Sequence, residues 1–299
     1  MAHTETKTGR ILKGVGGFYY VDVADALYEC RARGKFRLEK QTPTVGDIVD
    51  FEVVAANEGY LHAIHERKNS FVRPPVSNLD VLVVTASTAP PVTDPYLIDR
   101  LLAVAVCKGI TPVLALNKSD VRPADELFQI YTEAGFSCVK VSALTGEGGD
   151  ELRSILTGKL CAFAGNSGVG KSSLLNALYP GLQLATGALN DKIGRGRHTT
   201  RHVEILKLDG GTLLADTPGF SSYEITPADA MQKEELCRCF PEFSPYLGEC
   251  RFADCAHTGE DGCAVAAAKE AGKISGQRYT SYVRLYEKLA EYLPWETGK

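Results

Sequence analysis

One eight-residue segment, Gly165–Ser172, restricts the fold of this chain more than any other part of its sequence. It reads Gly-Asn-Ser-Gly-Val-Gly-Lys-Ser and matches the pattern GxxxxGK[ST]. An apolar run at 160–164 precedes it and helical spacing at 171–179 follows it, which is the strand–loop–helix context of a phosphate-binding loop. Glycines let backbone N–H groups surround phosphate oxygens, and the helix N-terminus adds positive potential. The segment therefore predicts an α/β sheet that binds a nucleoside triphosphate.

The roles expected along this loop follow from its chemistry. Lys171 would reach the β- and γ-phosphates, and Ser172 would hold Mg²⁺. The expected phosphate contacts are Gly165, Asn166, Ser167, Gly168, Val169, Gly170, Lys171, Ser172 and Ser173. Asp216-Thr217-Pro218-Gly219 follows a predicted strand. Asp216 would hold Mg²⁺ indirectly, through the groups that coordinate the ion, and the Gly219 N–H would contact the γ-phosphate.

Two further motifs stand at predicted strand ends and select guanine. Asn117-Lys118-Ser119-Asp120 ends the strand expected at 112–116, and Asp120 can accept hydrogen bonds from guanine N1–H and its exocyclic amine. Lys118 can lie along the plane of the base. Ser142-Ala143 follows the next strand, where a backbone N–H can meet guanine O6. Adenine does not present that donor pair, so the sequence predicts GTP and GDP as ligands.

The order of these motifs is unusual. In most GTPases the phosphate-binding loop comes first, whereas here the guanine motifs at 117–120 and 142–143 precede it. Strands alternate with helices from residue 80 to residue 215, as in a sheet covered on both faces. The order therefore indicates a circular permutation of the same sheet.

The segment before the sheet has a different texture. Residues 9–68 suggest about five short strands separated by glycine turns, for which the OB-fold barrel is the commonest module. Arg31, Arg33, Lys35 and Arg37 alternate with smaller or apolar residues. In one continuous strand these charges share a face, and if Arg33-Gly34 is a turn they cluster at a hairpin tip. A solvated face and an RNA-binding face are both open interpretations.

A cysteine cluster marks the C-terminal region. Cys250, Cys255, His257 and Cys263 have the spacing C-x₄-C-x-H-x₅-C, the Cys₃His set of a closed structural zinc site. Cys237 and Cys239 lie upstream, and either could replace one ligand. Helices are expected at 264–271 and after Ser275, the second with an apolar stripe of Tyr279, Tyr282, Val283, Tyr286, Leu289 and Leu293.

Charge and hydropathy exclude some classes of protein. The net charge of −4 argues against a generally basic nucleic-acid-coating protein, so RNA contacts must come from local patches. No apolar stretch approaches the ~18 residues of a membrane span, and the polar N-terminus does not read as a secretory signal. We therefore expect a cytoplasmic protein with no membrane partner, and we expect a monomer.

With its flanking domains, the whole chain resembles the family of ribosome small-subunit-dependent GTPase A. The resemblance implies a multidomain α/β fold: an OB-fold RNA-binding domain at 1–68, a circularly permuted P-loop GTPase sheet at 69–222 and a helical zinc-binding domain at 223–299. It implies that the small ribosomal subunit and its rRNA are partners, that hydrolysis serves late subunit maturation and release, and that the cofactors are one structural Zn²⁺ and Mg²⁺ with GTP.

The resemblance also gives a role to the basic loop at 186–201. Family members carry a catalytic histidine there, which matches His198 in Gly-Arg-His-Thr-Thr. The corresponding loop of P-loop GTPases supplies a threonine to GTP and Mg²⁺; we assign Thr200, with Thr199 as the open alternative. Phe220 stands where other GTPases hold a water-orienting glutamine, so intrinsic hydrolysis should be slow. Slow turnover leaves open a nucleotide-gated rRNA-binding module with incidental hydrolysis; a P-loop kinase is disfavoured by the guanine motifs.

Overall fold

The computed structural model describes residues 5–24, 26–34, 36, 41–184, 203–217 and 231–291. These residues form two compact units. The first takes the described residues within Met1–Asp80, Thr157–Ala162 and Gly194–Phe220, and the second takes those within Val81–Leu156, Phe163–Ile193 and Ser221–Lys299. The boundaries expected at 68/69 and 222/223 stay predictions, and the second lies outside the described residues.

Five strands near the N-terminus close into a barrel, as the glycine-punctuated pattern predicts. The strands are β1 (Thr6–Val15), β2 (Phe18–Val23), β3 (Ala26–Ala32), β4 (Ile48–Ala55) and β5 (Glu58–Ile64). Their order is β1-β2-β3-β5-β4, and β4 returns to pair with β1. Alternate residues point inward, and fully buried Ile11, Val21, Cys30, Phe51 and Leu61 fill the interior.

The basic residues between Arg31 and Arg37 do not lie on one continuous strand. β3 ends at Ala32, so Arg33 lies beyond it and Gly34 is in a turn. Arg33 pairs with Glu52 of β4. The interpretation of all four basic residues on one continuous strand is therefore wrong, while Lys35 and Arg37 lie outside the described residues.

The first unit also contains several strands outside the barrel. After the small hairpin of β6 (Ser70–Phe71) and β7 (Val76–Ser77), the unit takes the start of β11 (Leu160–Ala164). β13 (Leu213–Asp216) pairs parallel with β11, and β12 (Glu204–Lys207) pairs antiparallel with β13. Lys13 of β1 pairs with Glu204 of β12, both by register and by a 2.9 Å contact between Nζ and Oε2.

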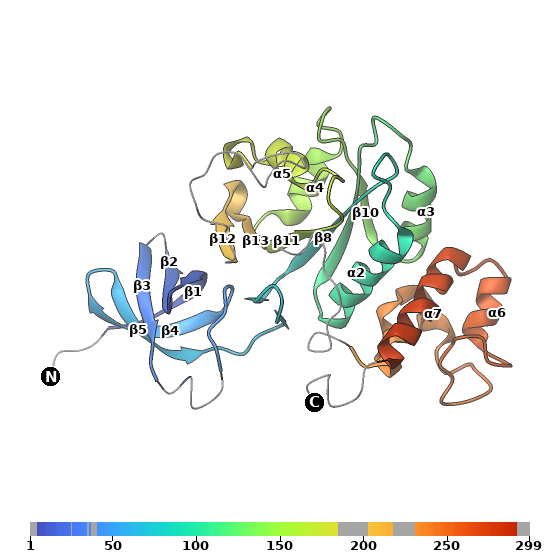
Figure 1. Ribbon diagram of the computed structural model, residues 1–299, viewed down its shortest axis with the longest axis horizontal. Helices are drawn as coiled ribbons and strands as arrows, with labels where there is room; N and C mark the ends of the chain where they lie inside the picture. Colours follow the sequence, from blue (N-terminus) through green and yellow to red (C-terminus); the bar gives the residue numbers. More distant parts are fainter. Residues whose placement is uncertain are drawn as a thin grey trace. The chain divides into compact units, whose positions relative to one another are not determined.

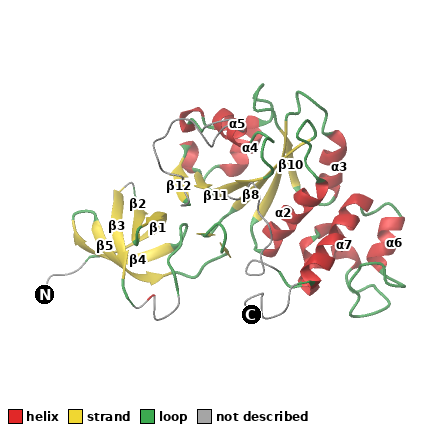
Figure 2. Cartoon of the chain, in the orientation of Figure 1, coloured by secondary structure: helices red, strands yellow, loops and turns green. Residues whose placement is uncertain are grey.

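Parallel strands and helices alternate in the second unit (Figure 1). β8 (Val81–Ser87), β9 (Thr111–Asn117) and β10 (Ser137–Lys140) are parallel neighbours in that order. Helices α2 (Pro95–Cys107) and α3 (Asp125–Glu133) cover one face, and α4 (Gly149–Leu156) lies beside α5 (Lys171–Leu178) on the other (Figure 2). β8 is buried along its whole length, as its apolar run predicts.

The C-terminal region of the second unit is a small helical cluster. It contains two 3₁₀ segments, η5 (Lys233–Cys239) and η6 (Pro241–Tyr246), and two helices, α6 (Ala264–Glu270) and α7 (Gly276–Ala290). α7 packs against α2 (Figure 1). The residues that α7 buries are Arg278, Ser281, Tyr282, Leu285 and Leu289. The expected stripe is therefore turned: Tyr279, Val283 and Tyr286 are only half-buried, and an arginine takes a core position.

Ser275 occupies the N-cap position of α7, as expected, but its side chain makes no capping hydrogen bond. None of the helices among the described residues is long and apolar enough to cross a membrane.

Candidate functional site

The phosphate-binding loop joins β11 to α5 at the predicted residues, in a conformation that requires its glycines. Gly165 has φ 136°, and a Cβ there would lie 2.1 Å from the backbone oxygen of Thr85 in β8. Gly170 caps α5 with φ 93°, and a Cβ there would lie 2.4 Å from the Asn117 side chain. Any other residue would strain or displace the loop at both positions, so the pattern GxxxxGK[ST] reflects a steric need.

Lys171 begins α5, and its side chain reaches back over the loop. Its Nζ donates to the backbone oxygens of Gly165 and Asn166, at 2.6 Å each. Burial lowers the pKa of Lys171 to about 8, because a partly buried ammonium has lost hydration. A phosphate oxygen would place a negative charge beside this ammonium and stabilise it, so the loop suits an anionic ligand.

Asn117 connects the phosphate-binding loop to both guanine motifs. Its buried side chain donates through Nδ2 to the Val169 backbone oxygen at 2.8 Å. Its Oδ1 accepts from the Ala143 N–H at 3.2 Å. Three motifs that are far apart in sequence therefore meet at one amide side chain within the second unit.

Lys118 and Ser119 continue these connections. Lys118 has a positive φ of 65°, and its Nζ donates to the backbone oxygens of Pro90 at 2.7 Å and Gly168 at 2.9 Å. Ser119 Oγ lies 3.0 Å from the Val141 backbone oxygen and 2.9 Å from a Glu147 oxygen. The lysine stem thus bridges the guanine motif and the phosphate-binding loop.

The remaining residues of the guanine motifs are available at the same edge. Asp120 is exposed directly after Ser119, while Ser142 is buried. Ser142 Oγ accepts from the N–H groups of Leu144 at 3.3 Å and Thr145 at 3.1 Å, which folds the loop after β10 into a turn. Asp120 and the Ser142-Ala143 turn therefore follow the ends of two neighbouring parallel strands, β9 and β10, where both could reach one base.

The predicted magnesium residues are only partly described. Asp216 ends β13 in the first unit, and β13 is parallel to the strand that enters the phosphate-binding loop. Ser172 is half-buried in the first turn of α5. His198, Thr199, Thr200, Gly219 and Phe220 lie outside the described residues, so their roles stay predictions.

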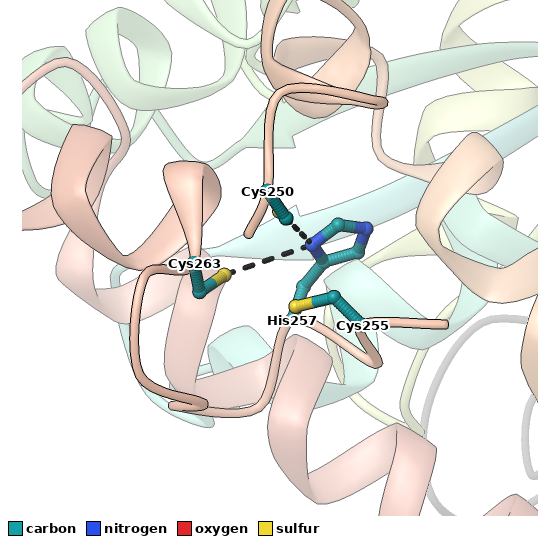
Figure 3. Close-up of side chains that lie close together, drawn as sticks. All are labelled: Cys250, Cys255, His257 and Cys263. Carbon is teal, nitrogen blue, oxygen red and sulfur yellow. Dashed lines mark hydrogen bonds between the residues drawn. The ribbon is translucent and has the colours of Figure 1, made fainter. Parts of the chain in front are cut away.

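The four predicted zinc ligands converge (Figure 3). Their ligand atoms all lie within 4.8 Å of one another. His257 Nδ1 is 3.4 Å from Cys250 Sγ and 3.6 Å from Cys263 Sγ. In a tetrahedral site with Zn–S of ~2.3 Å and Zn–N of ~2.0–2.1 Å, a sulfur and a nitrogen are about 3.6 Å apart. The cluster thus fits Zn²⁺ in both ligand type and spacing.

Burial raises the pKa of the Cys255 thiol to about 12, and a bound cation is what stabilises thiolates in such surroundings. Cys237 and Cys239 belong to η5 and are outside this group of ligand atoms.

Glu260 organises the ligand loop and was missed by the sequence analysis. Its carboxylate accepts from the N–H groups of Ala256 at 2.9 Å, Thr258 at 2.8 Å and Gly259 at 3.2 Å. The Cys255 thiol also donates to it, at 3.5 Å. Glu260 thereby satisfies the backbone donors of a tight loop in which His257 has a positive φ of 59°. A lone glutamate in a loop gives little signal in sequence.

The second missed residue is Arg278, which ties α7 to the parallel sheet region. Its Nη1 donates to Asp99 of α2 at 2.6 Å, and its Nε and Nη2 donate to Glu242 of η6 at 2.7 and 3.0 Å. The guanidinium lies 4.7–5.3 Å from three ring centroids, those of Tyr131, Phe136 and Phe240. An ion-pair cluster in which Arg278 and Asp99 are fully buried therefore fixes the C-terminal helical cluster on α2.

Comparison with known proteins places this geometry in a family. The model described as "RsgA GTPase" matches residues 64–226, and that described as "RsgA N-terminal domain" matches residues 8–61.

Curated relatives match over nearly the full chain. The protein named "Small ribosomal subunit biogenesis GTPase RsgA" from Caldanaerobacter subterraneus subsp. tengcongensis is 45% identical over 286 residues, 95% of this chain and 96% of the relative. The protein of the same name from a Geobacillus species (strain WCH70) is 44% identical over 292 residues, 96% of this chain and 98% of the relative.

Solved structures also match over nearly the whole chain. YjeQ from Thermotoga maritima matches with a TM-score of 0.82 at 33% identity, over 97% of this chain and 100% of that one. YloQ, described as a circularly permuted GTPase, matches with a TM-score of 0.79 at 33% identity, over 98% of this chain and 99% of that one. The solved structures thus match this chain from the N-terminal barrel to the C-terminal region, and one of them is also described as circularly permuted. This chain belongs to the RsgA GTPase family.

Proposed function

We propose that this protein hydrolyses GTP to GDP and phosphate on the small ribosomal subunit, and that hydrolysis accompanies late subunit maturation and the protein's own release. The observation that best supports this proposal is the position of the Asn117 side chain, which joins the phosphate-binding loop to the backbone of Ala143. This amide links the phosphate-binding loop to the loop expected to meet guanine O6. Guanine, unlike adenine, presents an N1–H and an exocyclic amine that the carboxylate of Asp120 can accept. The names of the full-length relatives support the ribosomal role.

The motif residues have separate tasks in that reaction. Asp120 would accept from guanine N1–H and the exocyclic amine, and a backbone N–H of the loop at Ser142-Ala143 would donate to guanine O6. The backbone N–H groups of the phosphate-binding loop bind the phosphates, and Lys171 neutralises charge between them. Ser172 and Thr200 would hold Mg²⁺, with Asp216 behind them. When bound, the ion neutralises negative charge that develops on the phosphates.

The remaining parts would attach the protein to its partner. The barrel and the zinc-binding region would contact the subunit and its rRNA, with one structural Zn²⁺ on Cys250, Cys255, His257 and Cys263. We place the protein in the cytoplasm, because ribosomal subunits of bacteria such as those that carry its relatives mature there, and we propose that it acts as a monomer.

Water activation is the step that His198 would serve. Phe220 cannot orient water, because its side chain has neither a donor nor an acceptor. We expect His198→Ala to keep GTP binding and subunit association but to lose roughly 10²–10⁴-fold of the subunit-stimulated rate, the scale of a positioned acid–base group. Phosphate release at saturating subunit tests this.

The alternative role for His198 is RNA contact beside Arg197. In that case the variant would bind the subunit more weakly and recover the full kcat at saturation. A normal kcat at saturating subunit would retire His198 as a catalytic residue.

Phe220 also favours the second candidate function, a nucleotide-gated rRNA-binding module in which hydrolysis is incidental. The two functions differ in the effect of the partner on turnover. Purified subunits would raise kcat if hydrolysis is coupled to release, and would leave it unchanged if the nucleotide only gates binding.

A further inference from the structure

The outer surface of the barrel carries two aromatic side chains, one exposed and one half-buried, with an arginine between them. Phe18 of β2 is the register partner of Arg31 of β3, and Arg31 is the register partner of Tyr60 of β5. The three strands are neighbours in the barrel (Figure 1). Alternate positions on these strands, including Val21, Cys30 and Leu61, are buried inside. Phe18, Arg31 and Tyr60 therefore form one row across the outer face, called here the aromatic row.

The row faces solvent, and its arginine lies over one of its two rings. Tyr60 is 38% exposed, Arg31 is exposed and Phe18 is half-buried. The Arg31 guanidinium lies 4.7 Å from the centroid of the Phe18 ring. Among the described residues Arg31 forms no ion pair, whereas Arg33 pairs with Glu52. A planar cation beside two rings is thus left facing solvent on a folded scaffold.

We propose that the aromatic row binds unpaired RNA bases by stacking. Phe18, Arg31 and Tyr60 each offer a flat face, and aromatic rings and guanidinium planes are the groups on which proteins stack unpaired bases. In OB-folds the face of the second and third strands is the usual one for oligonucleotides. The inference deepens the function proposed above, because it names the part of the RNA that the barrel holds.

The neighbouring row fixes how the strand of RNA lies. In the next register row Tyr20 faces Glu29, and Glu29 faces Glu58. Two carboxylates there repel phosphates, so the RNA backbone would lie away from that row, beside Arg31. The two rings of the aromatic row would therefore take bases while the charge of Arg31 also attracts a phosphate, an arrangement that favours single strands over duplexes.

A hollow extends the row at its other end. A cavity of about 260 Å³ within the first unit is lined by Val15, Gly17 and Phe18 of the β1–β2 hairpin and by Pro43 and Pro75. The Gly16-Gly17 turn has positive φ at both residues and no atoms within 4 Å of where side chains would project. The open turn leaves room for a nucleotide beyond Phe18.

Titration of the full chain with a fluorescently labelled single-stranded RNA octamer tests the proposal, read by anisotropy. Tyr60→Leu and Phe18→Leu keep apolar bulk and remove the flat ring, and each should weaken binding roughly tenfold or more. Arg31→Gln should weaken binding and also reduce the dependence of affinity on salt by about one phosphate contact.

Leu27→Ala is the matched control, because Leu27 is 49% exposed on β3 and points to the same outer face outside the row. It should bind RNA like the unaltered protein. Circular dichroism and GTP binding check that each variant is folded.

Unchanged RNA affinity in Tyr60→Leu and Phe18→Leu would overturn the proposal, as would equal affinity for a duplex of the same sequence. So would variants that bind RNA normally but lose association with the small subunit, because the row would then contact a protein. Failure of the unaltered protein to sediment with subunits would instead refute the proposed function, and the RNA titration does not depend on that result.

Discussion

At the scale of single residues, Asn117 shows why this family's motifs are separate in sequence yet act together. Its amide has one donor end and one acceptor end, and each is used for a different motif. An aspartate could accept from Ala143 but could not donate to Val169, and a leucine could do neither. The side chain is buried, so both bonds are protected from competition by water.

Asp120 is the residue expected to select guanine, and its substitution should weaken the binding of one nucleotide and improve that of another. Asp120→Asn replaces an acceptor by a donor, so GTP binding should weaken by about 2–4 kcal/mol, the cost of a charge-assisted hydrogen-bond pair. Binding of xanthosine triphosphate should improve, because its base presents an acceptor there. Calorimetric titration with both nucleotides measures the change. Unaltered GTP affinity in a folded variant would remove Asp120 from the site.

At the scale of elements, the proposed zinc site would hold the loop before α6 together through its four side chains. Purified protein should contain one Zn²⁺ per chain by metal analysis. Cys255→Ser should lower the zinc content and destabilise the region of α6 and α7, because metal binding and folding of such a loop are one equilibrium. GTP binding should largely remain.

Cys237→Ser provides the control for the zinc prediction. Cys237 donates to the Glu234 backbone oxygen at 3.7 Å in η5, outside the four ligands. Equal loss of zinc from both serine variants, or metal-free protein with a folded C-terminal region, would contradict the assignment.

Arg278 gives a second prediction at this scale. Arg278→Met leaves Asp99 and Glu242 buried without their partner, which should lower the free energy of unfolding by about 3–5 kcal/mol. Chemical denaturation measures the change. Arg284→Met is the control on the same helix, because Arg284 is exposed and lies over the Tyr96 ring at 3.9 Å. A similar small effect in both variants would mean that the cluster contributes little to stability.

How much the sequence could predict also differs by element. Strands such as Leu160–Ala164 and the positions of the motifs follow from local patterns, and the structure reproduces them. The burial of Arg278 does not, because its partner Asp99 is 179 residues away in sequence. The expected stripe of α7 was turned for the same reason: hydrophobic spacing cannot reveal that a distant carboxylate makes an arginine a core residue.

At the scale of the whole molecule, the permutation alters which segment comes after the nucleotide switch. Asp216-Thr217-Pro218-Gly219 is followed directly by the chain that leads to the zinc-binding region. In the usual motif order the sheet continues at that point instead. Contact between Gly219 and the γ-phosphate would therefore bias the zinc-binding region without any intervening domain, and loss of the phosphate would favour departure from the subunit.

The most direct test of the account is the steady-state rate of phosphate release from GTP, with and without saturating purified small ribosomal subunits, with ATP measured in parallel. We predict slow release from GTP by the protein alone, a marked rise in kcat when subunits are added, and no comparable hydrolysis of ATP under either condition. A kcat that subunits leave unchanged, or ATP hydrolysis at the rate of GTP hydrolysis, would contradict it.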